Sequence, residues 1–217
     1  MAKVNIDIIK GKVFSAYAEV PFDEGKEALE REGYRIISLE ENARLRMREG
    51  KDSFIFKYGN WTREGVIYIP KKGIFLTKNS PVMQNPKEAT DCHRRNKEFY
   101  LTNERVENAL ADSVELNEKQ VPTNRFGDNE ITVYAFGSIA KQYGEFLRDA
   151  GIKEMPVWLE ELQDKPFVRQ LWFGNLDIRS GLLGTNDKDL DSGYGMRGVR
   201  ASVQGTAKNI EAKVLRQ

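Results

Sequence analysis

The segment Val66-Ile67-Tyr68-Ile69-Pro70-Lys71-Lys72-Gly73-Ile74-Phe75-Leu76-Thr77 decides the fold class of this chain. Two runs rich in β-branched and aromatic residues, 66–69 and 74–77, flank a short connection that contains proline, two lysines and glycine. Such runs favour extended strands, and a short glycine-containing connection between them favours an antiparallel hairpin. We therefore expect a β-hairpin here, and with it a sheet that has antiparallel neighbours.

Further strand patterns lie on both sides of this hairpin. Apolar and polar residues alternate over 4–8, Lys10-Gly11 can turn the chain, and an apolar pattern resumes over 13–20, so we expect a second hairpin at the start. Residues 53–58 and 131–136 are also short runs of apolar and aromatic residues. These two runs are predicted as strands.

Helix signals stand between the strand patterns. Ser38-Leu39-Glu40-Glu41 has the form of a capping box, because the serine oxygen can accept from the amide three residues on while Glu41 reaches back. We expect this helix to run to about Glu49 and to end at Gly50. Pro156 suits a first helical position, and it precedes Trp158, Leu159 and Leu162 at helical spacing, which predicts another helix.

The order of these patterns favours an α+β fold. Hairpins and helices segregate along the chain instead of alternating strictly, so we expect short antiparallel hairpins with several capped helices packed on them. The C-terminal part differs in composition. Because glycine recurs there, we expect irregular loops between residues 174 and 205, around Gly181, Gly184, Gly193, Gly195 and Gly198.

The polar stretch 117–129 is the best candidate for a boundary between two halves. It contains Pro122 and Gly127 and separates patterned segments on either side. One organisation is an α+β subdomain over 1–116 and a strand-helix unit with a loop-rich end over 130–217. The alternative is a single compact domain in which 117–129 is a long surface loop.

Composition bounds the class of protein. The 217 residues include 34 Lys and Arg against 33 Asp and Glu, for a formal net charge of +1, so no global field draws the chain toward nucleic acid or a membrane. With 40% hydrophobic and 31% charged residues and a mean hydropathy of −0.59, we expect a soluble globular protein and no membrane partner. The start of the chain reaches Asp7 before any long apolar run, so we expect a cytoplasmic location.

The single cysteine and single histidine exclude several chemistries. Cys92 cannot form an intramolecular disulfide, and His93 cannot join a second histidine in a metal site. The sequence also has no P-loop and no zinc-protease motif. Adjacent positions on a helix diverge by about 100°, so Cys92 and His93 do not form a nucleophile-base pair. His93 stays a candidate catalytic residue for acid-base work near neutral pH.

The leading candidate site is the segment Gly193-Tyr194-Gly195-Met196-Arg197-Gly198. It matches the dinucleotide-binding glycine pattern, but no buried strand is expected before it and too few residues follow it for the motif's helix and second strand. Glycine-rich backbone can still turn its amides toward an anion, and arginines add bidentate bonds. The candidate ligand-binding residues are Gly193, Tyr194, Gly195, Arg197, Gly198 and Arg200, and the partner would be nucleic acid or a phosphorylated ligand.

An acidic group nearby suggests a metal-assisted alternative. Asp187, Asp189 and Asp191 alternate, so in an extended chain their carboxylates share one face and could bind Mg²⁺ or Ca²⁺, although the EF-hand pattern is not met. Asp177 and Arg179 also alternate and are candidates for catalysis. Together these residues would support an enzyme acting on a phosphorylated or anionic substrate.

Three hypotheses follow for function. The first is a soluble intracellular binding or interaction protein for a phosphate-bearing partner, with no cofactor. The second is the metal-assisted enzyme. The third is a structural assembly protein, for which a homo-oligomer is one form, anchored by Trp172 and Phe173. Arg44, Arg46 and Arg48 alternate along the first capped helix, but nearby glutamates favour a solvated helix face over a nucleic-acid track.

Overall fold

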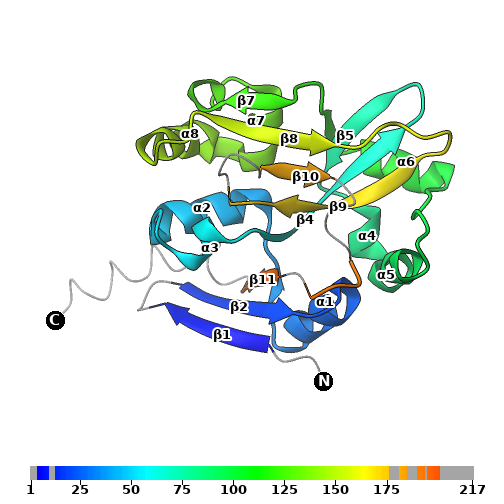
Figure 1. Cartoon of the computed structure of the whole chain (residues 1–217), viewed down its shortest axis with the longest axis horizontal. Coiled ribbons are helices and arrows are strands. Elements are labelled where there is room, and N and C mark those ends of the chain that lie inside the picture. The colour runs from blue at the N-terminus through cyan, green and yellow to red at the C-terminus, as the bar shows by residue number, and fades with distance from the viewer. Residues whose placement is uncertain (1–3, 10–12, 176–180, 185–189, 194, 201–217) are drawn as a thin grey trace.

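Eight α-helices and eleven strands make up the part of the chain that the computed structural model describes, residues 4–9, 13–175, 181–184, 190–193 and 195–200 (Figure 1). The helices are α1 (Phe22–Arg31), α2 (Leu39–Glu49), α3 (Phe54–Lys57), α4 (Pro81–Gln84), α5 (Pro86–Arg94), α6 (Asn103–Leu110), α7 (Glu130–Phe136) and α8 (Ala140–Asp149). The strands are β1 (Val4–Ile9), β2 (Val13–Glu19), β3 (Arg35–Ile36), β4 (Asn60–Ile69), β5 (Gly73–Thr77), β6 (Ser113–Glu115), β7 (Gln120–Pro122), β8 (Glu154–Leu159), β9 (Phe167–Phe173), β10 (Leu182–Gly184) and β11 (Gly195–Val199).

The strands form a mixed sheet in the order β1-β2-β11-β4-β9-β10-β8-β7. β3 pairs with β11, and β5 joins β4 to β6. Most neighbours are antiparallel, whereas β11 runs parallel to β4 and β10 runs parallel to β8. The α+β fold class predicted from the sequence is therefore confirmed.

The core has two large parts, one on each face of the central strands. Val66 and Tyr68 of β4 pack with residues of α2, α7 and α8, whereas Ile67 and Ile69 pack with residues of α1, α5 and α6. Successive side chains of a strand point to opposite faces of its sheet, so β4 serves both parts. Figure 1 shows α2, α7 and α8 apart from α1, α5 and α6.

A break in the register of β4 lets this strand pair with both β9 and β11. Its pairing with β9 shifts between Trp61 and Gly65, and Trp61 also pairs with Met196 of β11. The carbonyls of Thr62 and Glu64 both accept a hydrogen bond from the buried Gln170 amide, the second at 2.8 Å. This amide satisfies backbone groups that the bulge leaves without strand partners.

Three local predictions are confirmed. β4 and β5 form the antiparallel hairpin, with Ile69 opposite Gly73, and β1 and β2 pair antiparallel as the predicted hairpin at the start. Ser38 caps α2 through the reciprocal box with Glu41, and α2 ends at Glu49 before Gly50, whose φ is +87°. These features depend on chemistry within a few residues, which explains why the sequence reveals them.

Three other local predictions are wrong. Residues 131–136 form helix α7, because Asn129 accepts from the amide of Thr132 and caps a turn that buries one face. Residues 54–57 form the short helix α3. Residues 154–159 form strand β8, where Met155 and Val157 are buried and Trp158 is exposed, which is a period of two. Short apolar runs carry too little periodicity to separate helix from strand.

The expectation of an irregular glycine-rich C-terminal region needs correction. Residues 195–199 form a fully buried strand between β2 and β4, and 182–184 form a second buried strand. The glycines serve close packing. A Cβ atom at Gly195 would lie 2.1 Å from Tyr17 Oη, and one at Gly198 would lie 2.8 Å from Leu29 Cδ2.

Strands from both sides of 117–129 share the sheet, since β4 pairs with β9. Residues 120–122 within this stretch form β7, which pairs with β8. The division of the chain into two subdomains stays a prediction. None of the helices in the described ranges has the length and apolar character that a membrane span requires.

A buried carboxyl group lies where β4 meets the start of α2. Glu64 is 1% exposed, and its Oε2 accepts from the Leu39 amide at 3.1 Å. Burial raises the pKa of Glu64 to about 7, outweighing the backbone amides and the nearby Arg63 that lower it. The folded protein therefore holds a proton here that the unfolded chain releases at about pH 4.5.

We predict that Glu64 makes stability fall as pH rises through this window. The protonated carboxyl group of Glu64 contributes to the free energy of unfolding in full below pH 4.5. This contribution is lost as pH approaches about 7, a change of about 3 kcal/mol. Relative to the wild type, Glu64→Gln should therefore gain about 2 to 3 kcal/mol between about pH 5 and pH 8 in urea unfolding. The exposed Glu145→Gln is the control and should show no such gain. Parallel pH profiles for wild type and Glu64→Gln would refute the assignment.

We also predict that Gly198 is required for packing. Ala at this position lowers backbone entropy in the unfolded chain, but its Cβ would overlap Leu29 and Tyr34, so Gly198→Ala should cost about 1–3 kcal/mol. Gly193→Ala is the matched control, because its Cβ would have no neighbour closer than 3.6 Å. Thermal unfolding should separate the two variants. Equal stability of both would contradict the packing role.

Candidate anion-binding pocket

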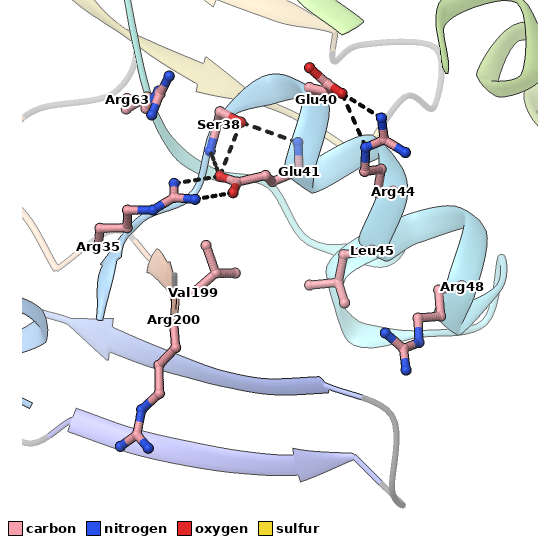
Figure 2. Close-up of a pocket in the computed structure, with 10 residues that line it drawn as sticks. All are labelled: Arg35, Ser38, Glu40, Glu41, Arg44, Leu45, Arg48, Arg63, Val199 and Arg200. Atoms are coloured by element: carbon pink, nitrogen blue, oxygen red, sulfur yellow. Dashed lines mark hydrogen bonds and ion pairs between the residues drawn. The ribbon is translucent and has the colours of Figure 1, made fainter. Parts of the chain in front are cut away.

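A hollow of about 510 Å³ opens along α2, from Glu40 to Arg48, next to β3 and the end of β11 (Figure 2). Two glutamates, a serine and two aliphatic residues contribute to its wall. The rest of the wall consists of five arginines, Arg35, Arg44, Arg48, Arg63 and Arg200. The residues come from distant parts of the chain, and the pairing of β11 with β3 brings them together.

The floor of the pocket is apolar. Leu45 of α2 and Val199 of β11 line the hollow, and both pack with the buried Ile37 and Ile55. Figure 2 shows these two side chains between the arginines. A ligand in the pocket would therefore meet an apolar surface beneath a ring of cations.

Both glutamates of the pocket are already engaged. The Arg35 guanidinium donates to both carboxylate oxygens of Glu41, with Nη1 to Oε2 at 2.7 Å. Burial by itself raises the pKa of Glu41, but hydrogen bonds from Arg35 and Ser38 outweigh it and hold the pKa below its ordinary value. Arg44 Nη2 donates to Glu40 at 2.6 Å, one helical turn away. Two arginines are thus neutralised by the two acids.

The start of α2 is also occupied by acids. The Glu41 carboxylate accepts from the Ser38 amide at 3.0 Å, and Glu64 accepts from the Leu39 amide. These groups already satisfy amides that a free helix N-terminus would offer to an anion. Any anion bound here would depend on the arginine side chains.

Three arginines remain exposed around the hollow with little compensation. Arg63 Nε lies 4.0 Å from the Glu64 carboxyl group, whose pKa of about 7 leaves it only partly ionised at neutral pH. Arg200 lies over the Tyr34 ring at 4.6 Å and donates to the Glu32 carbonyl at 3.5 Å. Within the described part of the chain, neither Arg48 nor Arg200 has a carboxylate within ion-pair distance.

The residues of the glycine-arginine site predicted from the sequence lie in different environments. Of its residues, Arg200 is exposed and lines the pocket, whereas Arg197 is 1% exposed in β11, with its guanidinium 5.7 Å from the Phe54 ring. Gly195 and Gly198 face Tyr17 and Leu29 closely, as described above, and Gly193 is exposed. Tyr194 lies outside the described residues.

The candidate acid-base and metal residues are only partly visible. His93 and Asp191 line a second hollow of about 580 Å³, together with Cys92. Burial raises the pKa of the Cys92 thiol, which disfavours the nucleophilic thiolate. Asp177, Arg179, Asp187 and Asp189 lie outside the described residues, and the residues that are described contain no group of acids, histidine and cysteine able to hold a metal.

Sequence reasoning missed most of the pocket. The alternation of Arg44, Arg46 and Arg48 predicts a solvated helix face. Arg44 and Arg48 are four residues apart and do line one face, whereas Arg46 is fully buried, 4.1 Å from the Phe173 ring, and donates to the Gly174 carbonyl at 2.6 Å. An i, i+4 arginine pair was the one signal available.

Comparison with known proteins shows the fold. No family model and no curated protein matches the sequence. A solved structure described as "Accommodation of massive sequence variation in Nanoarchaeota by the C-type lectin fold" is similar to this chain, with a TM-score of 0.64 and 14% identity over 89% of this chain and 99% of the other. At this identity the likeness concerns the fold alone, and the chain adopts a C-type lectin fold.

Proposed function

We propose that this protein binds a phosphate-bearing ligand in the arginine pocket. The observation that carries the proposal is the imbalance of charge in the wall, five arginines against two glutamates that are already paired with Arg35 and Arg44. Arg48, Arg63 and Arg200 are left exposed toward an unassigned anion. Gathering like charges costs free energy, and a bound anion would offset that cost.

Arginine suits phosphate better than other cations do. Its planar guanidinium presents several N–H donors in a fork that matches two oxygens of one phosphate, and such charge-assisted bonds are short and strong. The hollow of about 510 Å³ falls in the usual range of small-molecule sites, so it has room for more than a single phosphate group. The apolar floor of Leu45 and Val199 would accept the uncharged part of a ligand.

This proposal keeps the first hypothesis from the sequence and relocates its site. Arg200 stays in the site, and residues of α2, β3 and β4 replace the buried Arg197 and its glycines. A cytoplasmic location belongs to the same proposal. The metal-assisted enzyme and the assembly protein stay predictions, and no contact among the described residues favours either of them.

We predict that inorganic pyrophosphate binds the wild type in isothermal titration calorimetry, and that affinity falls as salt rises. Replacing Arg48, Arg63 and Arg200 together by alanine should weaken binding at least about tenfold, because each charge-assisted bond contributes about 1.5–3 kcal/mol. It should leave thermal stability nearly unchanged, since exposed charges contribute little to folding.

The control variant removes the same number of positive charges elsewhere. Lys119, Lys141 and Lys153 are exposed and lie outside the pocket wall, so their replacement by alanine should leave pyrophosphate affinity within about twofold of the wild type. Equal losses in the two triple variants would show nonspecific attraction, and the proposal would then be abandoned.

A further inference from the structure

Three aromatic side chains gather on the surface beside the arginine pocket, and we call them the aromatic cluster: Tyr17 of β2, Phe54 of α3 and Tyr58. The Tyr17 and Phe54 rings meet edge to face with centroids 5.3 Å apart, and the Phe54 and Tyr58 rings lie 4.6 Å apart, tilted by 34°. Phe54 is 40% exposed and Tyr58 is 57% exposed. The cluster therefore offers aromatic surface to solvent.

The hydrophobic core accounts for the neighbours of these rings but not for the rings themselves. Ile55 and Phe56, the next residues of α3, are buried in the core. Phe54 and Tyr58 flank them, and the Phe54 ring contacts the rings of Tyr17 and Tyr58 and lies near the Arg197 guanidinium. Single exposed apolar residues are common on protein surfaces. Adjacent exposed rings beside arginines that lack carboxylate partners are typical of a binding surface.

Strand β11 connects the aromatic cluster to the pocket. Arg197 is paired with Tyr17 across the sheet and lies 5.7 Å from the Phe54 ring, and Val199, two residues on, forms the pocket floor. Alternate residues of a strand share one face and are about 7 Å apart, so the cluster and the pocket adjoin on one face.

The helices connect the same two features. Ile55 of α3 packs with Leu45 and Val199 of the pocket floor, which places α3 against the pocket. Arg48 stands near the end of α2, a few residues before Phe54. Figure 1 shows α2 and α3 side by side on the same side of β2 and β11. The aromatic cluster and the arginine pocket are therefore neighbours.

We propose that this surface binds single-stranded nucleic acid, with backbone phosphates in the arginine pocket and bases stacked on Phe54 and Tyr58. The proposal rests on the proposed function and specifies its ligand. Proteins that bind single strands combine a basic groove with aromatic side chains on which bases stack, and the stacking accepts any base because every base has a π-face. In a duplex the bases are stacked on one another and the rings cannot reach their faces, so a duplex would use the pocket alone.

The test compares four probes by fluorescence anisotropy and competition. They are a labelled single-stranded oligonucleotide of about twelve residues, its duplex, an abasic strand of the same length, and inorganic pyrophosphate as competitor. The wild type should bind the single strand at least about tenfold more tightly than either the duplex or the abasic strand, because only the single strand presents free base faces.

The variant Phe54→Ala with Tyr58→Ala should lose about tenfold or more in affinity for the single strand. It should leave the affinity for the abasic strand and for pyrophosphate within about twofold, because the arginines are untouched. The matched control replaces Tyr100 and Trp158 by alanine, which are 45% and 47% exposed and lie outside both the pocket and the cluster, and it should bind every probe like the wild type. If loss of Phe54 unfolds the protein, Tyr58→Ala alone should give a smaller loss of the same kind.

The two proposals fail in different ways. Pyrophosphate binding that needs Arg48, Arg63 and Arg200, combined with single-strand binding that is indifferent to Phe54 and Tyr58, would overturn this inference and leave the pocket as a phosphate site. Equal affinity for the abasic and the normal strand would also overturn it. Absence of pyrophosphate binding and of strand binding would overturn both.

Discussion

Close packing of strand β11 is the constraint on which the rest of the structure depends. β11 lies between β2 and β4, and side chains at positions 195 and 198 would collide with Tyr17 and Leu29, so both positions are glycine. This strand joins the β1-β2 hairpin to the central sheet. It also brings Val199 into the floor of the arginine pocket, Arg200 into its wall, and Arg197 beneath the ring of Phe54.

The other side of the pocket depends on buried polar groups at the junction of β4 and α2. Gln170 holds the bulge of β4, and the carboxyl group of Glu64, within that bulge, accepts from the first amide of α2. The capping box and Arg35 engage Glu41 at the same point. The acids near the pocket therefore form hydrogen bonds within the protein, because buried or partly buried polar groups need partners. Arg48, near the end of α2, and Arg200, directly after β11, have no carboxylate partner among the described residues. The pocket is positive because its acids are paired while these arginines are not.

The charge of the pocket and the apolar surface beside it suit one kind of ligand together better than either does alone. A small anion would use the arginines and leave the rings of Phe54 and Tyr58 exposed, whereas an uncharged aromatic ligand would leave Arg48, Arg63 and Arg200 unpaired. A chain that alternates phosphates with flat bases would engage both. The C-type lectin fold does not by itself imply such a ligand, since function resides in the residues placed on a fold.

The sequence by itself determined the features that depend on near neighbours in the chain: the β4-β5 hairpin, the Ser38 capping box and the α+β class. Only the tertiary structure decided that 131–136 is a helix and 154–159 a strand, because burial on one face or on alternate residues depends on what packs against them. The candidate site also depends on the tertiary structure. Whether an arginine is buried like Arg46, paired like Arg35 or exposed like Arg200 depends on neighbours far away in sequence, so composition and spacing alone could not distinguish these three environments.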